Sequence, residues 1–356
     1  MMTYSVIMAG GVGSRFWPMS RRARPKHLLP LVNGMPLIEA TIKRVLPIIP
    51  QENIIIVTNE YQYRRIFEIL PWLNENSFLI EPFGRNTAPC IGLAAVRIKA
   101  QDPTAVMAVL PADHIIDDVA EFQKCLQQAI EIAREDDSLV TIGIPPTRVE
   151  TGYGYIQRNH RLNDHLPIYQ VKTFAEKPNL ATAKRFIKSG DFYWNSGIFI
   201  WRVDVIMKHF EEFLPELYQR LCEIEELSTA PDAKKQLRYI YRRTRNISID
   251  YGIMERAPSV KVIEGKFGWG DIGSWEEAYR RTAKDKNGNA SVGEHLFLGS
   301  RNCYVNSAKK FVAVVGLENV IVVDSGNALL VCDRNNAQDV KEVVEQLERR
   351  KAKRFL

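Results

Sequence analysis

The sequence predicts an α/β protein with a mixed, mostly parallel sheet and a small β-rich domain toward its C-terminus. Short, nearly continuous apolar runs recur in the first two thirds of the 356 residues, as is typical of strands covered on both faces. Stretches with helical spacing separate these runs, and such alternation indicates βαβ units. After a turn cluster at residues 285–289 the apolar runs shorten, and glycine and asparagine interrupt them.

The elements of the larger part follow from these runs in order. The expected strands cover residues 6–9, 54–58, 78–81, 106–110, 139–144, 153–158, 171–176, 197–201 and 260–264. Helical spacing is found at residues 37–45, 61–70 and 88–100, and a long helical region at about 204–245 is expected to pack outside the sheet.

The C-terminal part is expected to hold short strands and a final helix. The strands cover residues 303–306, 312–315, 320–324 and 328–331, and they could wind as part of a β-helix. The helix begins near residue 337, and its apolar stripe consists of Val340, Val343, Val344 and Leu347. We therefore expect two domains, residues 1–285 and 286–356.

Composition and charge favour a small polyanionic substrate. Hydrophobic residues make up 46% of the chain and charged residues 25%, as in ordinary soluble globular proteins. The net charge of +6 would steer anions toward the protein. It would also suit nucleic acid, but the basic residues are scattered, and the one dense run at 349–354 is expected at a helix end in water. We expect no nucleic-acid partner.

Cysteine usage and apolar run lengths predict a cytoplasmic protein. The five cysteines are widely spaced and form no C-x-x-C pair, which indicates buried thiols in a reducing compartment and disfavours a zinc site. The sequence has neither a signal-peptide pattern nor an apolar run of about 18 residues, so we expect no membrane association.

A glycine-rich turn follows the first expected strand, and two cations follow the turn. Residues 6–15 read VIMAGGVGSR, and Lys26 comes eleven residues after Arg15. Glycines let backbone N–H groups approach an anion closely, and Arg15 and Lys26 would then neutralise it. The expected nucleotide-binding residues of the turn are Ala9, Gly10, Gly11 and Gly13. A tight turn without a ligand is the alternative.

Two common phosphate-binding loops are excluded. The P-loop requires a lysine followed by serine or threonine after its last glycine, and no such pair follows Gly13. The dinucleotide fingerprint G-x-G-x-x-G requires a third glycine, and Phe16 occupies that position. A nicotinamide-dependent enzyme is therefore disfavoured.

Two aspartates are candidate ligands for Mg²⁺. Asp113 lies three residues after the apolar run 106–110, and Asp271 lies in a loop rich in glycine and tryptophan. Because ligands bind beyond the carboxyl ends of parallel strands, Asp113 is expected on the same edge as the glycine turn. Two carboxylates suffice for Mg²⁺, which keeps several waters and binds substrate phosphates. A helix cap is the alternative for Asp113, and His114 is expected to be structural.

Further polar groups suit a sugar phosphate and a nucleotide base. Mixed glycine, aromatic and amide groups satisfy both the hydroxyls and the apolar faces of sugars, and the candidates are Gly152, Tyr153, Glu176, Lys177 and Asn195. Plain turns and a surface ion pair are the alternatives. Polar groups that could read a base edge precede a helix at Arg85, Asn86 and Thr87, where a plain N-cap is equally consistent.

Taken together, these motifs resemble the sugar-1-phosphate nucleotidyltransferases, and more narrowly the short bacterial mannose-1-phosphate guanylyltransferases. The similarity extends from residue 5 to about residue 335. It includes the signature G-G-x-G-x-R…P-K and the segments 85–89, 110–114, 151–156, 176–178, 194–197, 248–251 and 270–273.

The resemblance implies a Rossmann-like catalytic domain and a left-handed β-helix-like domain that is often used in dimer contacts, hence a homodimer. It implies that Arg15 and Lys26 hold the nucleotide phosphates and that Asp113 and Asp271 bind Mg²⁺. Lys177 would meet the sugar phosphate. The sugar itself would meet Gly152, Glu176 and Asn195, and guanine would lie by Asn86 and Thr87. Longer relatives carry an isomerase domain, so isomerase activity is not expected here.

The implied reaction joins GTP and mannose 1-phosphate to give GDP-mannose and pyrophosphate. A phosphate monoester is mostly ionised at neutral pH, since its second pKa is near 6, so no general base is required. The protein must then hold two polyanions in line and stabilise the leaving group. A different sugar or nucleotide, or a non-catalytic nucleotide-sugar-binding homologue, is the alternative.

Overall fold

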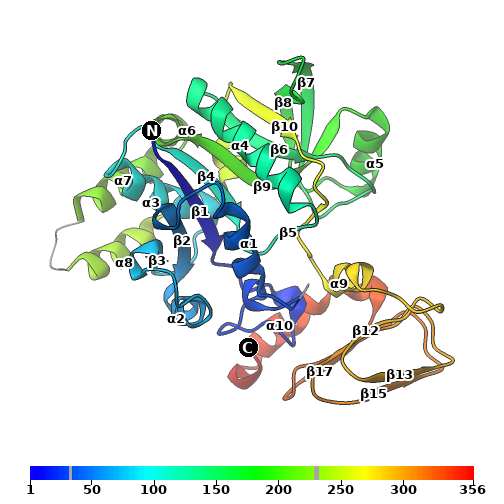
Figure 1. Cartoon of the computed structure of the whole chain (residues 1–356). Helices are drawn as coiled ribbons and strands as arrows, with labels where there is room; N and C mark the ends of the chain where they lie inside the picture. The colour runs from blue at the N-terminus through cyan, green and yellow to red at the C-terminus, as the bar shows by residue number, and fades with distance from the viewer. Residues whose placement is uncertain (32–33, 228–231) are drawn as a thin grey trace. The chain divides into compact units, whose positions relative to one another are not determined.

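The computed structural model describes residues 1–31, 34–227 and 232–356, and its contacts divide the chain into two compact units. The first unit contains Met1–Gly10 and Thr41–Gly270, and the second contains Gly11–Ala40 and Asp271–Leu356 (Figure 1). The second unit thus includes residues 11–40, which no change of composition marks in the sequence. The expected domain boundary at 285/286 stays a prediction.

The first unit is built on a nine-stranded sheet with the order β3-β2-β1-β4-β9-β6-β10-β8-β7. Neighbours among β3, β2, β1 and β4 are parallel, β10 is parallel to β6, and β9 is antiparallel to both β4 and β6. The bounds are β1 Thr3–Ala9, β2 Ile54–Asn59, β3 Phe78–Glu81, β4 Val106–Pro111, β6 Leu139–Ile144, β7 Tyr155–Arg161, β8 Ile168–Ala175, β9 Phe192–Arg202 and β10 Val260–Glu264. The predicted α/β class is confirmed.

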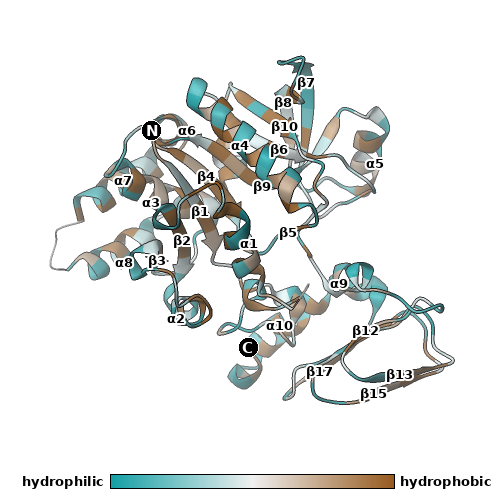
Figure 2. Ribbon diagram, in the orientation of Figure 1, coloured by the Kyte–Doolittle hydropathy of each residue, from teal (hydrophilic) through white to brown (hydrophobic). Residues whose placement is uncertain are grey.

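Helices cover this sheet, and two short strands pair beside it. The helices are α1 Leu37–Val45, α2 Glu60–Ile69, α3 Thr87–Lys99, α4 Val119–Glu135, α5 Leu180–Ser189, α6 Val203–Phe213, α7 Pro215–Glu226 and α8 Ala233–Arg243. The strand pair is β5 Ile115–Ile116 with β11 Trp269–Gly270. Figure 2 shows polar and apolar residues alternating along α4, as expected of a helix with one face on a sheet. None of the helices in the described ranges is both long and apolar enough to cross a bilayer.

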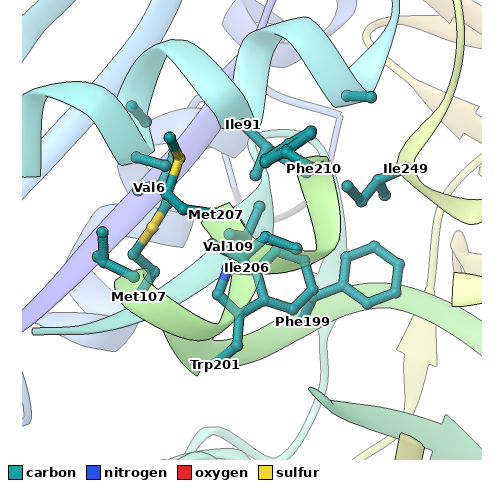
Figure 3. Close-up of a cluster of buried hydrophobic side chains, with 14 of the residues drawn as sticks. Val6, Ile91, Met107, Val109, Phe199, Trp201, Ile206, Met207, Phe210 and Ile249 are labelled. Carbon is teal, nitrogen blue, oxygen red and sulfur yellow. The ribbon is translucent and has the colours of Figure 1, made fainter. Parts of the chain in front are cut away.

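One large core cluster lies between the sheet and the helices α3, α6 and α7. Strand residues two apart share a face, so Met107 and Val109 of β4 join Phe199 and Trp201 of β9 in one cluster (Figure 3). Phe210 of α6 belongs to the same cluster and is fully buried. The helical region predicted at 204–245 therefore packs on this face as three helices, and its residues 228–231 lie outside the described residues.

The second unit stacks short parallel strands. β12, β14 and β16 are parallel neighbours, β17 is antiparallel to β16, and β13 pairs in parallel with β15. The bounds are α9 Trp275–Arg281, β12 Ala290–Val292, β13 His295–Leu298, β14 Tyr304–Ser307, β15 Val312–Val315, β16 Val320–Asp324, β17 Leu329–Asp333, α10 Val340–Arg349 and the 3-10 helix η8 Lys353–Phe355. Cys303, Val305 and Val314 form one buried cluster within it. The predicted β-helix-like module with a final helix is confirmed.

Candidate active site

Gly13 of the glycine turn and Lys26 lie side by side in the second unit. Gly13 has φ +73°, and a Cβ on it would lie 2.4 Å from the Lys26 Cβ, so this position requires glycine. The Lys26 backbone N–H donates to the Val12 carbonyl at 3.0 Å. The Lys26 side chain is only 6% exposed, and its Nζ donates to the Asp271 carbonyl. The structure thus brings Gly13, Lys26 and Asp271 together, although they are far apart in the sequence.

Arg15 extends from the same turn with an exposed side chain, and Gly11 is exposed beside it. The Asp271 side chain is half-buried, and a Cβ on Gly273 would lie 3.4 Å from both of its carboxylate oxygens. Between them, Ile272 has φ +38°, which a β-branched residue rarely adopts. Backbone strain of this kind tends to occur at functional sites, where the surrounding structure maintains it.

In the first unit, the carboxyl edge of the parallel strands carries further residues that the sequence predicts for the site. Ala9 is the last residue of β1, Gly10 follows it, and Asp113 comes two residues after β4. The Ala112 N–H donates to the Met8 carbonyl at 3.1 Å, which joins the two strand ends. Asp113 is half-buried. Gly10 and Asp113 therefore share one edge of the sheet, as the sequence predicts.

The alternative role for Asp113 does not apply. The helix α4 is capped by Asp118, whose carboxylate accepts a hydrogen bond from the Glu121 N–H at 3.0 Å. His114 Nδ1 accepts a hydrogen bond from Trp269 Nε1 at 3.2 Å, and the two rings lie nearly perpendicular, 5.2 Å apart. His114 thus joins β11 to the end of β4, which agrees with the structural role expected for it.

A second polar cluster in the first unit joins Gly154, Glu176, Lys177, Asn195 and Asp250. The Asn195 backbone N–H donates to the Gly154 carbonyl at 2.8 Å, and Asn195 Nδ2 donates to Asp250 Oδ1 at 2.8 Å. A Cβ on Gly154 would lie 2.4 Å from Glu176 Oε2, so only glycine leaves room for this carboxylate. Lys177 Nζ pairs with Glu176 Oε1 at 2.9 Å. The structure therefore brings together three of the residues predicted for the sugar phosphate.

Charge in this cluster is unbalanced toward acid. Burial, and then the nearby charge of Glu176, raise the pKa of Asp250 to about 6. The hydrogen bond to Glu176 raises the pKa of Lys177, which keeps its ammonium charged. Asp250 is a residue that the sequence reasoning missed, because segment 248–251 carried the family resemblance without a chemical role of its own.

Gly152 and Tyr153 have other partners. The Gly152 N–H donates to Glu150 Oε1 at 3.3 Å, and Gly152 is exposed. The Tyr153 ring packs edge-on against Trp194 at 5.3 Å and against Trp269 at 5.1 Å. Tyr153 thus contributes a buried aromatic contact beneath the polar cluster.

The segment predicted to read a base is held by hydrogen bonds within the protein. Asn86 has φ +70° and caps α3, since its Oδ1 accepts from the Thr87 N–H at 2.9 Å. Thr87 Oγ1 accepts from the Ile249 N–H at 2.8 Å, and Arg85 Nε donates to the Tyr241 carbonyl at 3.0 Å. Asn86 is therefore an N-cap, as the alternative interpretation expects. Thr87 joins α3 to the segment that contains Asp250.

Glu81, the last residue of β3, is a second residue that the sequence reasoning missed. It is 4% exposed, and its Oε1 accepts no hydrogen bond from the described residues. Its Oε2 would lie 3.8 Å from a Cβ on Gly10, so the carboxyl group faces the start of the glycine turn. Burial raises the pKa of Glu81 to about 8, and the hydroxyl of Tyr241 only partly opposes this rise. In the sequence, only its position as an acidic residue at the end of an apolar run could have identified Glu81.

Replacing Glu81 with Gln is expected to remove a pH dependence of stability. The pKa of Glu81 is about 8 in the folded state against 4.5 ordinarily, so the unfolded chain ionises first as the pH rises. Between these values the wild type should therefore lose up to about 1.4 kcal/mol of unfolding free energy per pH unit relative to Glu81→Gln. Urea denaturation from pH 5 to 8 measures this difference. The exposed Glu68→Gln serves as control, and parallel curves for Glu81→Gln and wild type would contradict the assignment.

The residues predicted for Mg²⁺ suit it chemically. Asp113 and Asp271 are half-buried carboxylates in loops, and hard oxygen ligands are those that Mg²⁺ prefers. Within the described ranges, no three His, Cys, Asp or Glu side chains gather into a group that could hold a metal. A magnesium ion here would therefore depend on substrate phosphates for its remaining ligands.

Known proteins resemble this chain over nearly its whole length. Residues 4–288 match the family model described as "Nucleotidyl transferase", and residues 293–347 match "MannoseP isomerase/GMP-like beta-helix domain". A putative mannose-1-phosphate guanylyltransferase of Vibrio cholerae is 38% identical over 97% of this chain and 74% of its own length. The mannose-1-phosphate guanylyltransferase of Klebsiella pneumoniae shows the same identity and coverage.

A solved structure from Thermus thermophilus, described as a mannose-1-phosphate geranyltransferase, is 34% identical. The similarity covers 98% of this chain and 100% of that one, with a TM-score of 0.88. The likeness therefore includes both the sheet and the β-helix-like module.

Proposed function

This chain belongs to the nucleotidyltransferase family, within it to the mannose-1-phosphate guanylyltransferases, and we propose that it transfers GMP from GTP to mannose 1-phosphate. The products are GDP-mannose and pyrophosphate. The observation that carries the proposal is the close contact of Gly13 with the buried Lys26, in a turn that also carries Arg15. This turn concentrates backbone N–H groups and two cations, which suits a nucleoside triphosphate.

The reaction proceeds by in-line attack. A phosphate oxygen of mannose 1-phosphate forms a bond to the α-phosphorus of GTP, the bond from the α-phosphorus to the bridging oxygen breaks, and pyrophosphate leaves with that electron pair. Arg15 offers a fork of donors to the phosphate oxygens, and Lys26 places a compact charge beside them. Asp113 and Asp271 would hold Mg²⁺, which would neutralise phosphate charge when bound.

The polar cluster around Glu176 is the proposed sugar site. Glu176 and Asn195 accept and donate hydrogen bonds as sugar hydroxyls require, and Asp250 fixes the Asn195 amide at 2.8 Å. Lys177 has φ +45°, an unusual conformation for a lysine, at the residue directly after Glu176. When the sugar phosphate binds, the Lys177 ammonium would leave its exposed ion pair with Glu176 and bind the phosphate group instead.

Glu81 supports guanine as the base. Guanine N1–H and the 2-amino group are adjacent donors on one edge, and their hydrogen bonds would lower the pKa of the buried Glu81 and stabilise it as a carboxylate beside Gly10. Uracil and thymine offer a single ring N–H between two carbonyl oxygens, and those oxygens would face the carboxylate unfavourably. Asn86 and Thr87 come shortly after Glu81 in the chain, and the hydrogen bonds that their side chains accept fix the start of α3.

The experiment that tests the proposal is product identification. Purified protein incubated with GTP, mannose 1-phosphate and Mg²⁺ should release pyrophosphate and form GDP-mannose in equal amounts, read by mass spectrometry. GTP hydrolysis without sugar transfer, or no reaction, would refute the proposal.

Exposed apolar residues on the β-helix-like module support a homodimer. Leu298 and Val315 are directly paired in the β13–β15 ladder, and each is 60% exposed. Further exposed apolar residues of this module are Val292, Leu296, Phe311, Leu317, Leu329 and Val331. Leu298 and Val315 form an exposed apolar patch on the β13–β15 ladder. Such patches mark interaction sites, and a C₂ dimer would bury the same patch on both subunits.

Introducing charge on this patch is expected to separate the subunits. The wild type should elute with a mass of twice 40.7 kDa, and Leu298→Glu with Val315→Glu should elute as the 40.7 kDa monomer. Light scattering coupled to gel filtration makes the measurement, and the exposed Lys286→Glu serves as control. A monomeric wild type would exclude the homodimer.

A further inference from the structure

The turn that carries Arg15 is fixed from one side by α9. The Phe16 ring lies 4.9 Å from the Trp275 ring, and Trp275 Nε1 donates to the Trp17 carbonyl at 3.0 Å. Trp275 has no exposed surface. The backbone on the C-terminal side of Arg15 therefore rests on a rigid aromatic residue of the same unit.

The C-terminal tail holds the same turn from a second direction. The Phe355 carbonyl accepts a hydrogen bond from Trp17 Nε1 at 2.9 Å and a second one from the Arg21 guanidinium. The other end of that guanidinium donates to Ser325 Oγ and Asn327 Oδ1, each at 3.2 Å. The Phe355 carbonyl thus accepts hydrogen bonds from two donors. The bond from Arg21 is charge-assisted and hence stronger.

A nearby ion pair on the surface joins Arg22 to α10, and it is expected to contribute little to the position of the turn. Arg22 forms an ion pair with Glu348 of α10 at 2.6 Å, but the two side chains are 62% and 49% exposed. Exposed ion pairs contribute little to stability because water and salt screen them. Arg22 therefore offers a matched control one residue away from Arg21.

We propose that the C-terminal tail is a positioning element of the active site, in which the Phe355 carbonyl holds Trp17 and Arg21 so that Arg15 keeps its reach toward the phosphates. This inference rests on the proposed function. The Arg15 side chain is exposed, and the backbone of its turn is therefore what fixes its direction. A displacement of about 1 Å in a catalytic group can cost about a hundredfold in rate. Trp17 and Arg21 act through Arg15, so they are positioning residues.

A kinetic double-mutant cycle tests the proposal. Trp17→Phe keeps an aromatic ring and loses the N–H, and deletion of residues 353–356 removes the acceptor. We expect the first change to lower kcat about tenfold and the deletion to lower it about ten- to a hundredfold, with a smaller change in the KM for GTP. Because both changes break the same bond, the combined variant should be no slower than the deletion alone. Arg22→Gln should stay within about twofold of wild type.

Loop order gives a readout that needs no turnover. Trypsin cleavage after Arg15 and Arg21 should accelerate in Trp17→Phe and in the deletion variant, while Arg22→Gln matches wild type at the remaining sites. If the deletion variant does not fold, Arg21→Gln replaces it, and the proposal then requires a loss of kcat in Trp17→Phe and in Arg21→Gln alike, while the criterion of multiplying losses applies to the deletion cycle alone. Wild-type kcat and cleavage rates in the single variants, or losses that multiply, would overturn the proposal. If the wild type were inactive but trypsin still cleaved Trp17→Phe and the deletion variant faster, the proposed function alone would be refuted.

Discussion

Replacing Lys26 with Gln is expected to lower kcat/KM for GTP by about a hundred- to a thousandfold, the loss that follows removal of one preorganised group that stabilises transition-state charge. Lys26 is nearly buried in contact with Gly13, so its charge is fixed where the phosphates are proposed to bind. Glutamine retains a donor to the Asp271 carbonyl but carries no charge. Initial rates of pyrophosphate release at varied GTP concentration provide the measurement.

The control for this variant is Arg24→Gln. Arg24 lies two residues before Lys26 and is exposed. Its replacement by Gln changes the net charge of the protein by the same amount and leaves the contacts of Lys26 in place. Melting temperatures of both variants show whether the fold persists. Equal rates for wild type and Lys26→Gln would remove Lys26 from the phosphate site.

Replacing Asp113 or Asp271 with Asn is expected to reduce kcat by two to four orders of magnitude, because each is proposed to hold the ion that neutralises the triphosphate. Because both carboxylates are proposed to bind the same ion, the double variant should be little slower than the worse single variant. Each variant should also require a higher Mg²⁺ concentration for half-maximal rate. Steady-state rates across a Mg²⁺ titration measure both effects.

Asp118→Asn is the matched control for these carboxylates. Asp118 caps α4, and asparagine caps helices about as well as aspartate, so activity should stay within about twofold. An unchanged Mg²⁺ requirement in both Asp113→Asn and Asp271→Asn would contradict the metal assignment.

The strands that the sequence predicted best are those of the parallel core. β1, β2 and β4 are covered on both faces, so their residues are apolar almost without interruption and stand out. β9 is longer than the predicted 197–201 because it begins with the buried aromatic residues 192–194, which Asn195 and Ser196 separate from the apolar run that the prediction used. Its antiparallel direction depends on chain topology, which periodicity does not encode.

The candidate site was predictable where several residues form a motif. The structure brings Gly13 close to Lys26, and Glu176 close to Asn195, while the roles predicted for these residues stay predictions. Glu81 and Asp250 were missed because each is a single carboxylate whose significance arises from burial, and burial depends on residues distant in sequence. The packing of residues 11–40 with the C-terminal residues was missed for the same reason, since it depends on Trp275 and Phe355.

A rate survey with each of the four common nucleoside triphosphates against several hexose 1-phosphates tests the central claim most directly. Pyrophosphate release gives kcat/KM for every pair under identical Mg²⁺. The account predicts the highest value for GTP with mannose 1-phosphate. A higher value for any pair without guanine, or no release with any pair, would contradict it.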